Sequence, residues 1–394
     1  MKNIAILITH GTDTLAWTHA YVRYALKKNS INVAITGSQI PLPALPSFSD
    51  AYINIANSVH FLRNIKPSHV FTVFNYGSQA FSDSLYKVDR WNNHAFSGDM
   101  IARMEWDEVK FADRSIEIED EPQKIDKLYL LTTGGTIAAS YNDNSALAPD
   151  IAAASMLEHY IKEQLKDAVD TIVERKALII DSSDLTMDKM KTIVDKVVEC
   201  AHKDGYKETF ADCCFDSNVR IIYTDPFKSI EDYKRESSGA SAVILAGYGG
   251  GNINIEKSYY SPLKLIKELL GKDIPVVLTS QVALGPADFI YENARKAIEI
   301  GVISGVDLSL PEIQVRLSYL LGHKDEICKY AKLNKSTFLH VIESLFVSGM
   351  KFRTRKSQKM YCALKGFTPC EKDLLINKTF EEALASIDIA AHKL

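Results

Sequence analysis

Seven short apolar segments recur along the 394-residue chain, and each ends in small or polar residues. Segments that are apolar throughout, rather than at alternate positions, are typical of strands buried on both faces. Helical patterns lie between most of them, such as those at 50–65 and 187–203. This alternation predicts an α/β fold whose parallel sheet is covered by helices on both faces. The segments read NIAILITHG, NVAITGSQ, HVFTVFN, LYLLTTGG, ALIIDSS, AVILAGYGG and IPVVLTSQ.

Two of the predicted strands end in glycine beside hydroxyl residues, as HGTDT at 10–14 and TTGGT at 132–136. Folds with parallel sheets bind ligands beyond the carboxyl ends of their strands. Glycine lets the backbone approach a ligand closely, and threonine supplies a hydroxyl group. The two strand ends are therefore candidates for one site. Each stretch is equally compatible with a strand-to-helix turn that carries a capping hydroxyl.

The pattern predicts three parts: a larger α/β domain at 1–215, a smaller one at 216–322 and a mostly helical C-terminal extension at 323–394. Within the first part, the charged residues 101–127 are expected to form a hairpin or edge segment that acts as a connector. The extension carries five more basic than acidic residues. This excess is typical of a solvated helix end or loop, and an RNA or partner contact is the alternative.

Composition excludes several classes of protein. The net charge is −4 and the isoelectric point about 6.2, so we expect no nucleic-acid partner and no attraction to an anionic membrane. No apolar run is long enough to span a bilayer, and the apolar N-terminal run is too short for a signal peptide. The six cysteines are scattered without a C-x-x-C pair, which indicates reduced thiols in a cytoplasmic protein.

The absence of several known catalytic motifs narrows the range of possible reactions. The sequence has no G-x-S-x-G, no phosphate-binding G-x-x-x-x-G-K-[ST] and no H-E-x-x-H, so we expect neither a metal nor a cofactor. Hydroxyl-based nucleophilic catalysis remains. A threonine hydroxyl needs a base near neutral pH, and a lysine oriented by Asp13 could take the proton of Thr12. Backbone N–H groups beside the glycines could stabilise an oxyanion, which suits amide hydrolysis.

Several motifs together resemble one family. TTGGTIA and HGTDT resemble the two signature motifs of the bacterial L-asparaginases, and VAITGSQIPL and IDSSDLT resemble their cytoplasmic type I branch. ILAGYGGGN, PVVLTSQ and GVISGVDLS resemble the small C-terminal domain of that family. The resemblance covers roughly 1–100 and 128–322. It implies a two-domain fold, hydrolysis of L-asparagine to L-aspartate and ammonia through a threonine-acyl intermediate, no cofactor, and a cytoplasmic homodimer or homotetramer.

The order of the motifs differs from the family's. In the family the TGGT motif opens the chain and HGTDT follows, whereas here HGTDT comes first. The resemblance therefore implies a circular permutation of the large domain. Its two halves would be 1–100 and 128–215, bridged by 101–127.

The resemblance also implies roles for individual residues. Thr136 matches the nucleophile, and Thr12, Asp13 and a lysine match a second cluster. We choose Lys87 because it precedes HAF at 94–96, as the family's lysine precedes a phenylalanine-containing stretch; the alternative is an ordinary surface lysine. The implied substrate-binding residues are Asp13, Asp181, Ser182, Ser183 and Asn252. Alternatively, Ser182, Ser183 or Asp184 caps the helix predicted at 187–203. Asn252 reaches a neighbouring subunit's site in some members, and the alternative is a turn residue.

Two departures from the family affect the expected activity. The family carries a tyrosine on the loop after TGGT, some way before a proline, but here Leu147 and Ala148 precede Pro149. Either Tyr141 activates Thr136 in its place or that activation is weakened. The arginine-rich stretch that precedes the family's lysine is replaced by GSQAFSDSLYK.

Two other functions remain open. One is an amidohydrolase for another amide, or an ammonia-donating subunit like the asparaginase-like partner in archaeal tRNA-dependent amidotransferases. The basic extension is the feature in favour of that subunit. The other is a catalytically weak protein that keeps the fold and binds an amino acid, which the displaced loop tyrosine favours.

Overall fold

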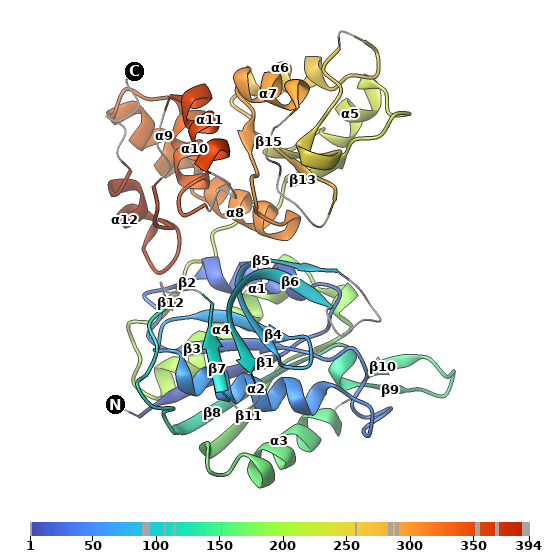
Figure 1. Ribbon diagram of the computed structural model, residues 1–394, viewed down its shortest axis with the longest axis vertical. Helices are drawn as coiled ribbons and strands as arrows, with labels where there is room; N and C mark the ends of the chain where they lie inside the picture. The colour runs from blue at the N-terminus through green and yellow to red at the C-terminus, as the bar shows by residue number, and fades with distance from the viewer. Residues whose placement is uncertain are drawn as a thin grey trace. The chain divides into compact units, whose positions relative to one another are not determined.

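The computed structural model describes residues 2–387, with gaps at 89–94, 106–107, 113–115, 151, 257, 283–286, 288–290, 351–354 and 367–369 (Figure 1). The chain divides into two compact units, Met1–Cys213 and Cys214–Leu394. We describe each unit on its own.

An eight-stranded sheet forms the centre of the first unit, in the order β11-β8-β1-β3-β4-β5-β6-β7. The first five strands in this order run parallel, which confirms the predicted parallel sheet. The last three are antiparallel. The strands are β1 (Ile4–Thr9), β3 (Asn32–Thr36), β4 (Val70–Phe74), β5 (Gln79–Lys87), β6 (Phe96–Glu105), β7 (Glu108–Phe111), β8 (Ile125–Gly134) and β11 (Val169–Ile180).

The sheet turns antiparallel after β4 because the connection to β5 is too short for a crossover. Asn75, Tyr76 and Gly77 all have positive φ, so the chain reverses within four residues. A parallel connection needs a dozen residues or more. The segment 101–127 contains the second half of β6 and all of β7, which pair antiparallel at the sheet edge. Its role as a connector stays a prediction.

Four helices cover the two faces of this sheet. The apolar side chains of α2 (Ala51–Asn64) and α3 (Ala152–Gln164) pack with Ala5 and Leu7 of β1 in one buried cluster. On the other face, α1 (Leu15–Ala25) and α4 (Met187–Lys203) contact each other and the sheet. Helices α2 and α4 are those predicted at 50–65 and 187–203. Residues 204–218, which follow α4, contain β12 (Phe210–Ala211), and this strand pairs with β2 (Leu26–Lys27).

The second unit has a four-stranded parallel sheet in the order β13-β14-β15-β16. Eight helices lie in its described part. The strands are β13 (Val219–Tyr223), β14 (Ala242–Gly247), β15 (Val276–Ser280) and β16 (Ile303–Ser304). The helices are α5 (Ile230–Glu236), α6 (Leu263–Leu270), α7 (Glu292–Glu299), α8 (Leu310–Gly322), α9 (Lys324–Leu333), α10 (Phe338–Phe346), α11 (Arg355–Lys365) and α12 (Phe380–Ala385).

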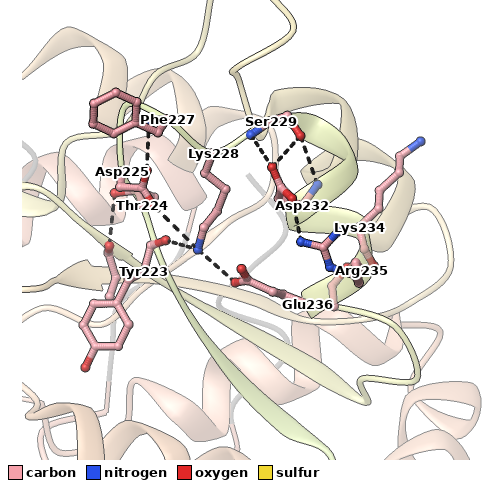
Figure 2. Close-up of polar contacts among 12 residues, drawn as sticks. Tyr223, Thr224, Asp225, Phe227, Lys228, Ser229, Asp232, Lys234, Arg235 and Glu236 are labelled. Atoms are coloured by element: carbon pink, nitrogen blue, oxygen red, sulfur yellow. Dashed lines mark hydrogen bonds and ion pairs between the residues drawn. The ribbon is translucent and has the colours of Figure 1, made fainter.

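The loop between β13 and α5 is fixed by its own polar contacts, as Figure 2 shows. Lys228 Nζ donates to the Tyr223 carbonyl at 2.7 Å and pairs with Glu236 at 2.9 Å. Ser229 and Asp232 form a capping box at the start of α5. The lysine ammonium therefore serves to close this loop.

Buried polar contacts join helices α9–α12 to the rest of the second unit. Arg316 of α8 is 2% exposed, and its guanidinium donates to Asp373 at 3.0 Å and to the Ser348 carbonyl at 2.7 Å. The buried Tyr361 hydroxyl donates to Glu343 at 2.5 Å. The residues expected to form a separate extension therefore share a core with α8, and a boundary at 322 stays a prediction. Among the described residues, no helix combines the length and apolar character needed to cross a membrane.

Candidate active site

The two Thr–Gly motifs lie at one edge of the first unit's sheet. Strands β1 and β8 are parallel neighbours, with Thr9 opposite Thr132. The Thr133 hydroxyl donates to the Thr9 carbonyl at 2.9 Å and joins the two strand ends. Thr12 and Thr136 follow three and four residues further on, so two segments 124 positions apart reach the same edge of the sheet.

A third strand end meets these two. Strand β11 flanks β8 on its other side and leads into Ser182. A Cβ atom on Gly11 would lie 2.4 Å from Ser182 Oγ, and one on Gly135 would lie 2.3 Å from Gly11 Cα. The Thr14 hydroxyl also donates to the Ser182 carbonyl at 2.7 Å. Glycine at both positions is what allows the three strand ends to converge.

Lys87 lies at the end of β5 and reaches the first motif. Its Nζ donates to Thr12 Oγ1 at 2.9 Å and to Asp13 Oδ1 at 2.8 Å. The structure therefore brings together the threonine, aspartate and lysine that the sequence analysis grouped. His94, used in choosing this lysine, lies outside the described residues, and Phe96 begins β6.

The geometry of this cluster permits proton transfer, and its ion pair adds little stability. The side chains of Lys87 and Asp13 are 28% and 61% exposed. An ion pair this exposed contributes at most about 1 kcal/mol to folding. The Thr12 hydroxyl, in contrast, is within direct proton-transfer distance of the amine.

Thr136 sits on a turn that requires glycine. Gly134 and Gly135 have φ of 87° and 75°, and a Cβ on Gly134 would lie 2.5 Å from the Ile180 carbonyl oxygen. Thr136 then begins the short helix η1 (Thr136–Ala138), whose other two residues are buried. The turn leaves the threonine half-buried at the sheet edge.

Tyr141 lies on a β-hairpin directly after η1. Strand β9 (Ala139–Tyr141) pairs with β10 (Leu147–Pro149), and Tyr141 stands opposite Leu147. Its side chain is 57% exposed. A role in activating Thr136 stays a prediction.

The segment after β11 is held by local hydrogen bonds. One carboxylate oxygen of Asp181 accepts from the backbone N–H and the hydroxyl of Ser183, both at 2.8 Å. These bonds cap the short helix η2 (Ser182–Asp184). The following helix α4 is capped by Thr186, so the alternative that Ser182, Ser183 or Asp184 caps it is wrong. Asp181 and Ser183 are exposed, so they remain accessible to a ligand.

Asn252 lies in the second unit and is described there alone. It follows the glycine-rich turn after β14, where Gly250 and Gly251 have positive φ. Its carbonyl accepts from the Tyr248 N–H at 2.8 Å and closes the turn. The turn-residue alternative matches these contacts, and a role in a substrate site stays a prediction.

Sequence reasoning missed a buried histidine within the first motif. His10 Nδ1 donates to the Gly11 carbonyl at 2.7 Å, which leaves Nε2 to accept from the Thr18 hydroxyl at 2.9 Å. Burial lowers the pKa of His10 to about 4, so the ring is neutral at pH 7. The sequence feature that could have pointed to this histidine is its position directly before Gly11 in HGTDT.

A pocket lies beside η1 but does not contain the cluster. It has about 350 Å³ of empty space, counting open solvent, and is lined by residues such as Ile137, Asp150 and Leu157. Thr12 and Lys87 are not among its lining residues. We take the convergent strand ends, and not this pocket, as the candidate active site, because they hold the groups able to react. In the described part of the chain, no group of three or more His, Cys, Asp or Glu could hold a metal ion.

Two family models match the chain. "Asparaginase, N-terminal" matches residues 2–117 and 127–208, and "Glutaminase/Asparaginase C-terminal domain" matches 218–333. Together they match most of the first unit and the second unit as far as residue 333.

Curated proteins give the same picture at low identity. The chain is 25% identical to the L-asparaginase of Thermococcus kodakarensis over 329 residues, covering 83% of this chain and 73% of the relative. It is 36% identical to L-asparaginase 1 of Escherichia coli (strain K12) over 97 residues, 24% of this chain and 26% of that one. It is also 25% identical to a glutamyl-tRNA(Gln) amidotransferase subunit of Methanobrevibacter smithii over 332 residues, covering 83% of this chain but only 56% of that relative.

Solved structures share the fold. The thermostable L-asparaginase from Thermococcus kodakarensis aligns with a TM-score of 0.52 at 21% identity, over 84% of this chain and 74% of that one. L-asparaginase I from Vibrio cholerae aligns with a TM-score of 0.50 at 18% identity, with the same coverage.

Proposed function

The chain belongs to the asparaginase family, and we propose that it hydrolyses L-asparagine to L-aspartate and ammonia. The observation that carries this proposal is the contact of Lys87 with both Thr12 and Asp13, beside the turn that bears Thr136. The L-asparaginase relative that aligns with 83% of this chain supports the same activity.

In the proposed reaction the Thr136 hydroxyl attacks the side-chain amide carbon. A β-acyl-threonine ester forms, the C–N bond breaks, and the nitrogen leaves as ammonia with the threonine proton. Water then attacks the ester and releases aspartate. Lys87, oriented by Asp13, exchanges a proton with Thr12 during these steps. Backbone N–H groups of the glycine turn stabilise the oxyanion. Tyr141 is the candidate for assisting Thr136.

Substrate specificity comes from pairing both charged groups at the α-carbon. The carboxylates of Asp13 and Asp181 attract the α-ammonium group, and the Ser182 hydroxyl donates to the α-carboxylate. The Ser183 hydroxyl donates to the α-carboxylate after it turns away from Asp181. A site that pairs both groups rejects analogues that lack either one, because its polar side chains are then left unpaired.

This specificity can be tested with four amides. Purified protein is incubated with L-asparagine, L-glutamine, succinamate (no α-ammonium) and 3-aminopropanamide (no α-carboxylate), and products are followed by NMR. The proposal expects fast turnover of asparagine and at least about 100-fold slower turnover of the two truncated amides. Equal turnover of all four amides would contradict the proposed binding residues.

A circular permutation of the first unit is part of the proposal. The Tyr206 hydroxyl donates to the Lys2 carbonyl at 2.7 Å, and the Asp126 N–H donates to the Asn3 carbonyl at 2.9 Å. Residue 206 is therefore a neighbour of residue 2, where the family order would join them. The N-terminal family model also matches as two separate segments. A reordered chain that joins residue 206 to residue 3 should fold and keep asparagine turnover.

We also propose a homodimer or homotetramer in which Asn252 approaches the site of a neighbouring subunit, and a cytoplasmic location. Sedimentation equilibrium of the wild type measures the number of subunits. If Asn252 serves a neighbour, Asn252→Ala raises KM without changing the mass of the assembly. A monomer with full activity would contradict this part of the proposal.

An ammonia-donating role within an amidotransferase is the second candidate. The similarity to the glutamyl-tRNA(Gln) amidotransferase protein of Methanobrevibacter smithii favours it, although the chain spans little more than half of that relative. A gel-shift experiment with tRNA(Gln) separates the two functions. A retarded tRNA band together with slow free asparagine hydrolysis would favour the amidotransferase role. Tight asparagine binding with negligible turnover would instead favour an amino-acid-binding protein.

A further inference from the structure

The strand that carries Lys87 is irregular in the stretch just before the lysine. The pairing of β5 with β4 runs from Gln79 to Phe81 and ends there. Beyond this point its pairing with β6 shifts register twice before Tyr86, and Ser84 has a φ of 50°. The ladder resumes at Tyr86 and Lys87, which pair with Ser97 and Phe96 of β6, so the residues between Phe81 and Tyr86 need another anchor to keep the end of β5 in place.

Helix α1 holds β5 at the point where the ladder to β4 ends. His19 Nε2 lies 2.8 Å from the Ser82 carbonyl oxygen, and its Nδ1 lies 2.9 Å from the Thr72 hydroxyl of β4. The Arg23 guanidinium donates to Asp83 at 3.2 Å. His19 and Arg23 are four residues apart, so they project from the same face of the helix.

The same helix begins at the other half of the cluster. Thr12 and Asp13 immediately precede α1, and Asp13 contacts Lys87. Arg23, in the last turn of α1, contacts Asp83, and Asp13, two residues before α1, contacts Lys87. The end of β5 therefore runs along α1 from its last turn to its start.

The anchoring histidine is neutral. A carbonyl only accepts, so Nε2 of His19 carries the hydrogen and Nδ1 accepts from Thr72. Burial and the nearby Arg23 charge lower the pKa of His19 to about 4, against smaller opposing effects of the Ser82 carbonyl and Asp83. The anchor therefore keeps its hydrogen bonds throughout the neutral pH range.

We infer that His19 and Arg23 are positioning residues for Lys87: they hold β5 along α1 so that the lysine amine meets Thr12 and Asp13. The partners Ser82 and Asp83 belong to the stretch GSQAFSDSLYK, which differs from the arginine-rich stretch of the family. The catalytic consequence rests on the proposed function, but the placement of Lys87 is measurable without turnover.

The first test is the labelling rate of Lys87 by an amine-reactive reagent, measured by mass spectrometry relative to Lys162 of α3. His19→Leu removes both hydrogen bonds, and His19→Gln can restore them. Freed from Thr12 and Asp13, Lys87 should be labelled about fivefold faster in His19→Leu and in Arg23→Met, in line with the loss of about one hydrogen bond. The rate should return towards that of wild type in His19→Gln and Arg23→Lys.

Asn32→Leu is the matched control. Asn32 is also buried in the first unit and bonds the Ile65 carbonyl and the His69 N–H, so its loss destabilises without touching β5. Its Lys87 labelling rate should equal that of wild type. If His19→Leu does not fold, the Arg23 variants carry the test. An unchanged Lys87 rate in folded Arg23→Met would overturn the inference.

A double-mutant cycle then separates positioning from a general structural role. His19→Leu should lower kcat about tenfold with KM little changed, and this loss should disappear in a Lys87→Met background. A loss that persists in full there would contradict action through Lys87. If the wild type does not turn over asparagine but the labelling follows the expected order, the proposed function fails and the positioning role stands.

Discussion

The amine of Lys87 lies 2.9 Å from the Thr12 hydroxyl, although the two residues are 75 positions apart in the chain. The lysine comes from an antiparallel strand and the threonine from the turn after a parallel one. Both are held by α1, which starts beside the threonine and anchors the lysine's strand. The reactive pair is therefore a product of the tertiary fold of the first unit.

Removing the lysine amine should affect catalysis and leave stability almost unchanged. Lys87→Met should lower kcat for asparagine by about 10²- to 10⁴-fold, the usual contribution of a general acid or base. Its free energy of unfolding should change by less than about 1 kcal/mol because the ion pair with Asp13 is exposed. Lys162→Met, which breaks an exposed pair with Glu158, is the control and should leave both quantities unchanged. A Lys87→Met enzyme with wild-type kcat would exclude this cluster from the reaction.

The close approach of the strand ends should make one glycine hard to replace. Gly135→Ala places a Cβ 2.3 Å from Gly11 Cα at a φ of 75°, so it should lower the free energy of unfolding by about 3 kcal/mol or more. Gly205→Ala has similar backbone strain, at a φ of 94°, but no atom within 4 Å of the new Cβ. It should cost only about 1–2 kcal/mol. Chemical denaturation measures the loss of unfolding free energy in each variant. Equal losses would show that the strand ends are not packed as described.

Acid should destabilise the first unit through its buried histidines. His10 and His19 have a pKa of about 4 when folded, against 6.5 as the ordinary value. Between pH 4 and pH 6.5 the unfolded chain therefore binds more protons than the folded protein. The stability from the neutral rings is complete above pH 6.5 and is lost as pH falls towards 4.

The His19→Gln variant isolates one of these contributions. Between pH 6.5 and pH 5, wild type should lose up to about 2 kcal/mol more unfolding free energy than the variant, at about 1.4 kcal/mol per pH unit for one proton. Denaturation curves at the two pH values give this difference. Identical losses in the two proteins would show that His19 titrates normally in the folded state.

The second unit should depend on a buried arginine. Arg316→Met leaves Asp373 and two backbone carbonyls without their donor, and should cost about 3–5 kcal/mol. Arg235→Met removes an exposed pair with Asp232 and should change stability by less than about 0.5 kcal/mol. Thermal unfolding followed by circular dichroism compares the two. A small effect at Arg316 would mean that helices α9–α12 do not share the core of α8.

Periodicity alone predicted much of the fold. Apolar runs such as that of β1 can only be buried on both faces, so they specify a parallel sheet and place the ends of β1 and β8 at one edge. The antiparallel strand β5 was not predicted. Its direction depends on a four-residue turn whose positive φ values are not encoded by the apolar pattern.

The site was predicted only in part, for a similar reason. Thr12 and Asp13 are neighbours in the chain, and their chemistry can be recognised locally. Lys87 was assigned from family resemblance, because a lysine on a polar stretch carries no local sign of its partners. The anchors His19 and Arg23 were missed, since their contacts with Ser82 and Asp83 depend on how α1 packs on β5.

The central claim is that both threonine motifs serve one asparagine-hydrolysing site. The most direct measurement is ammonia release from L-asparagine by wild type, Thr12→Ala and Thr136→Ala, each shown to be folded by circular dichroism. The account predicts turnover by wild type and a loss of at least about 100-fold in each variant. Full activity in either folded variant, or no turnover by folded wild type, would contradict it.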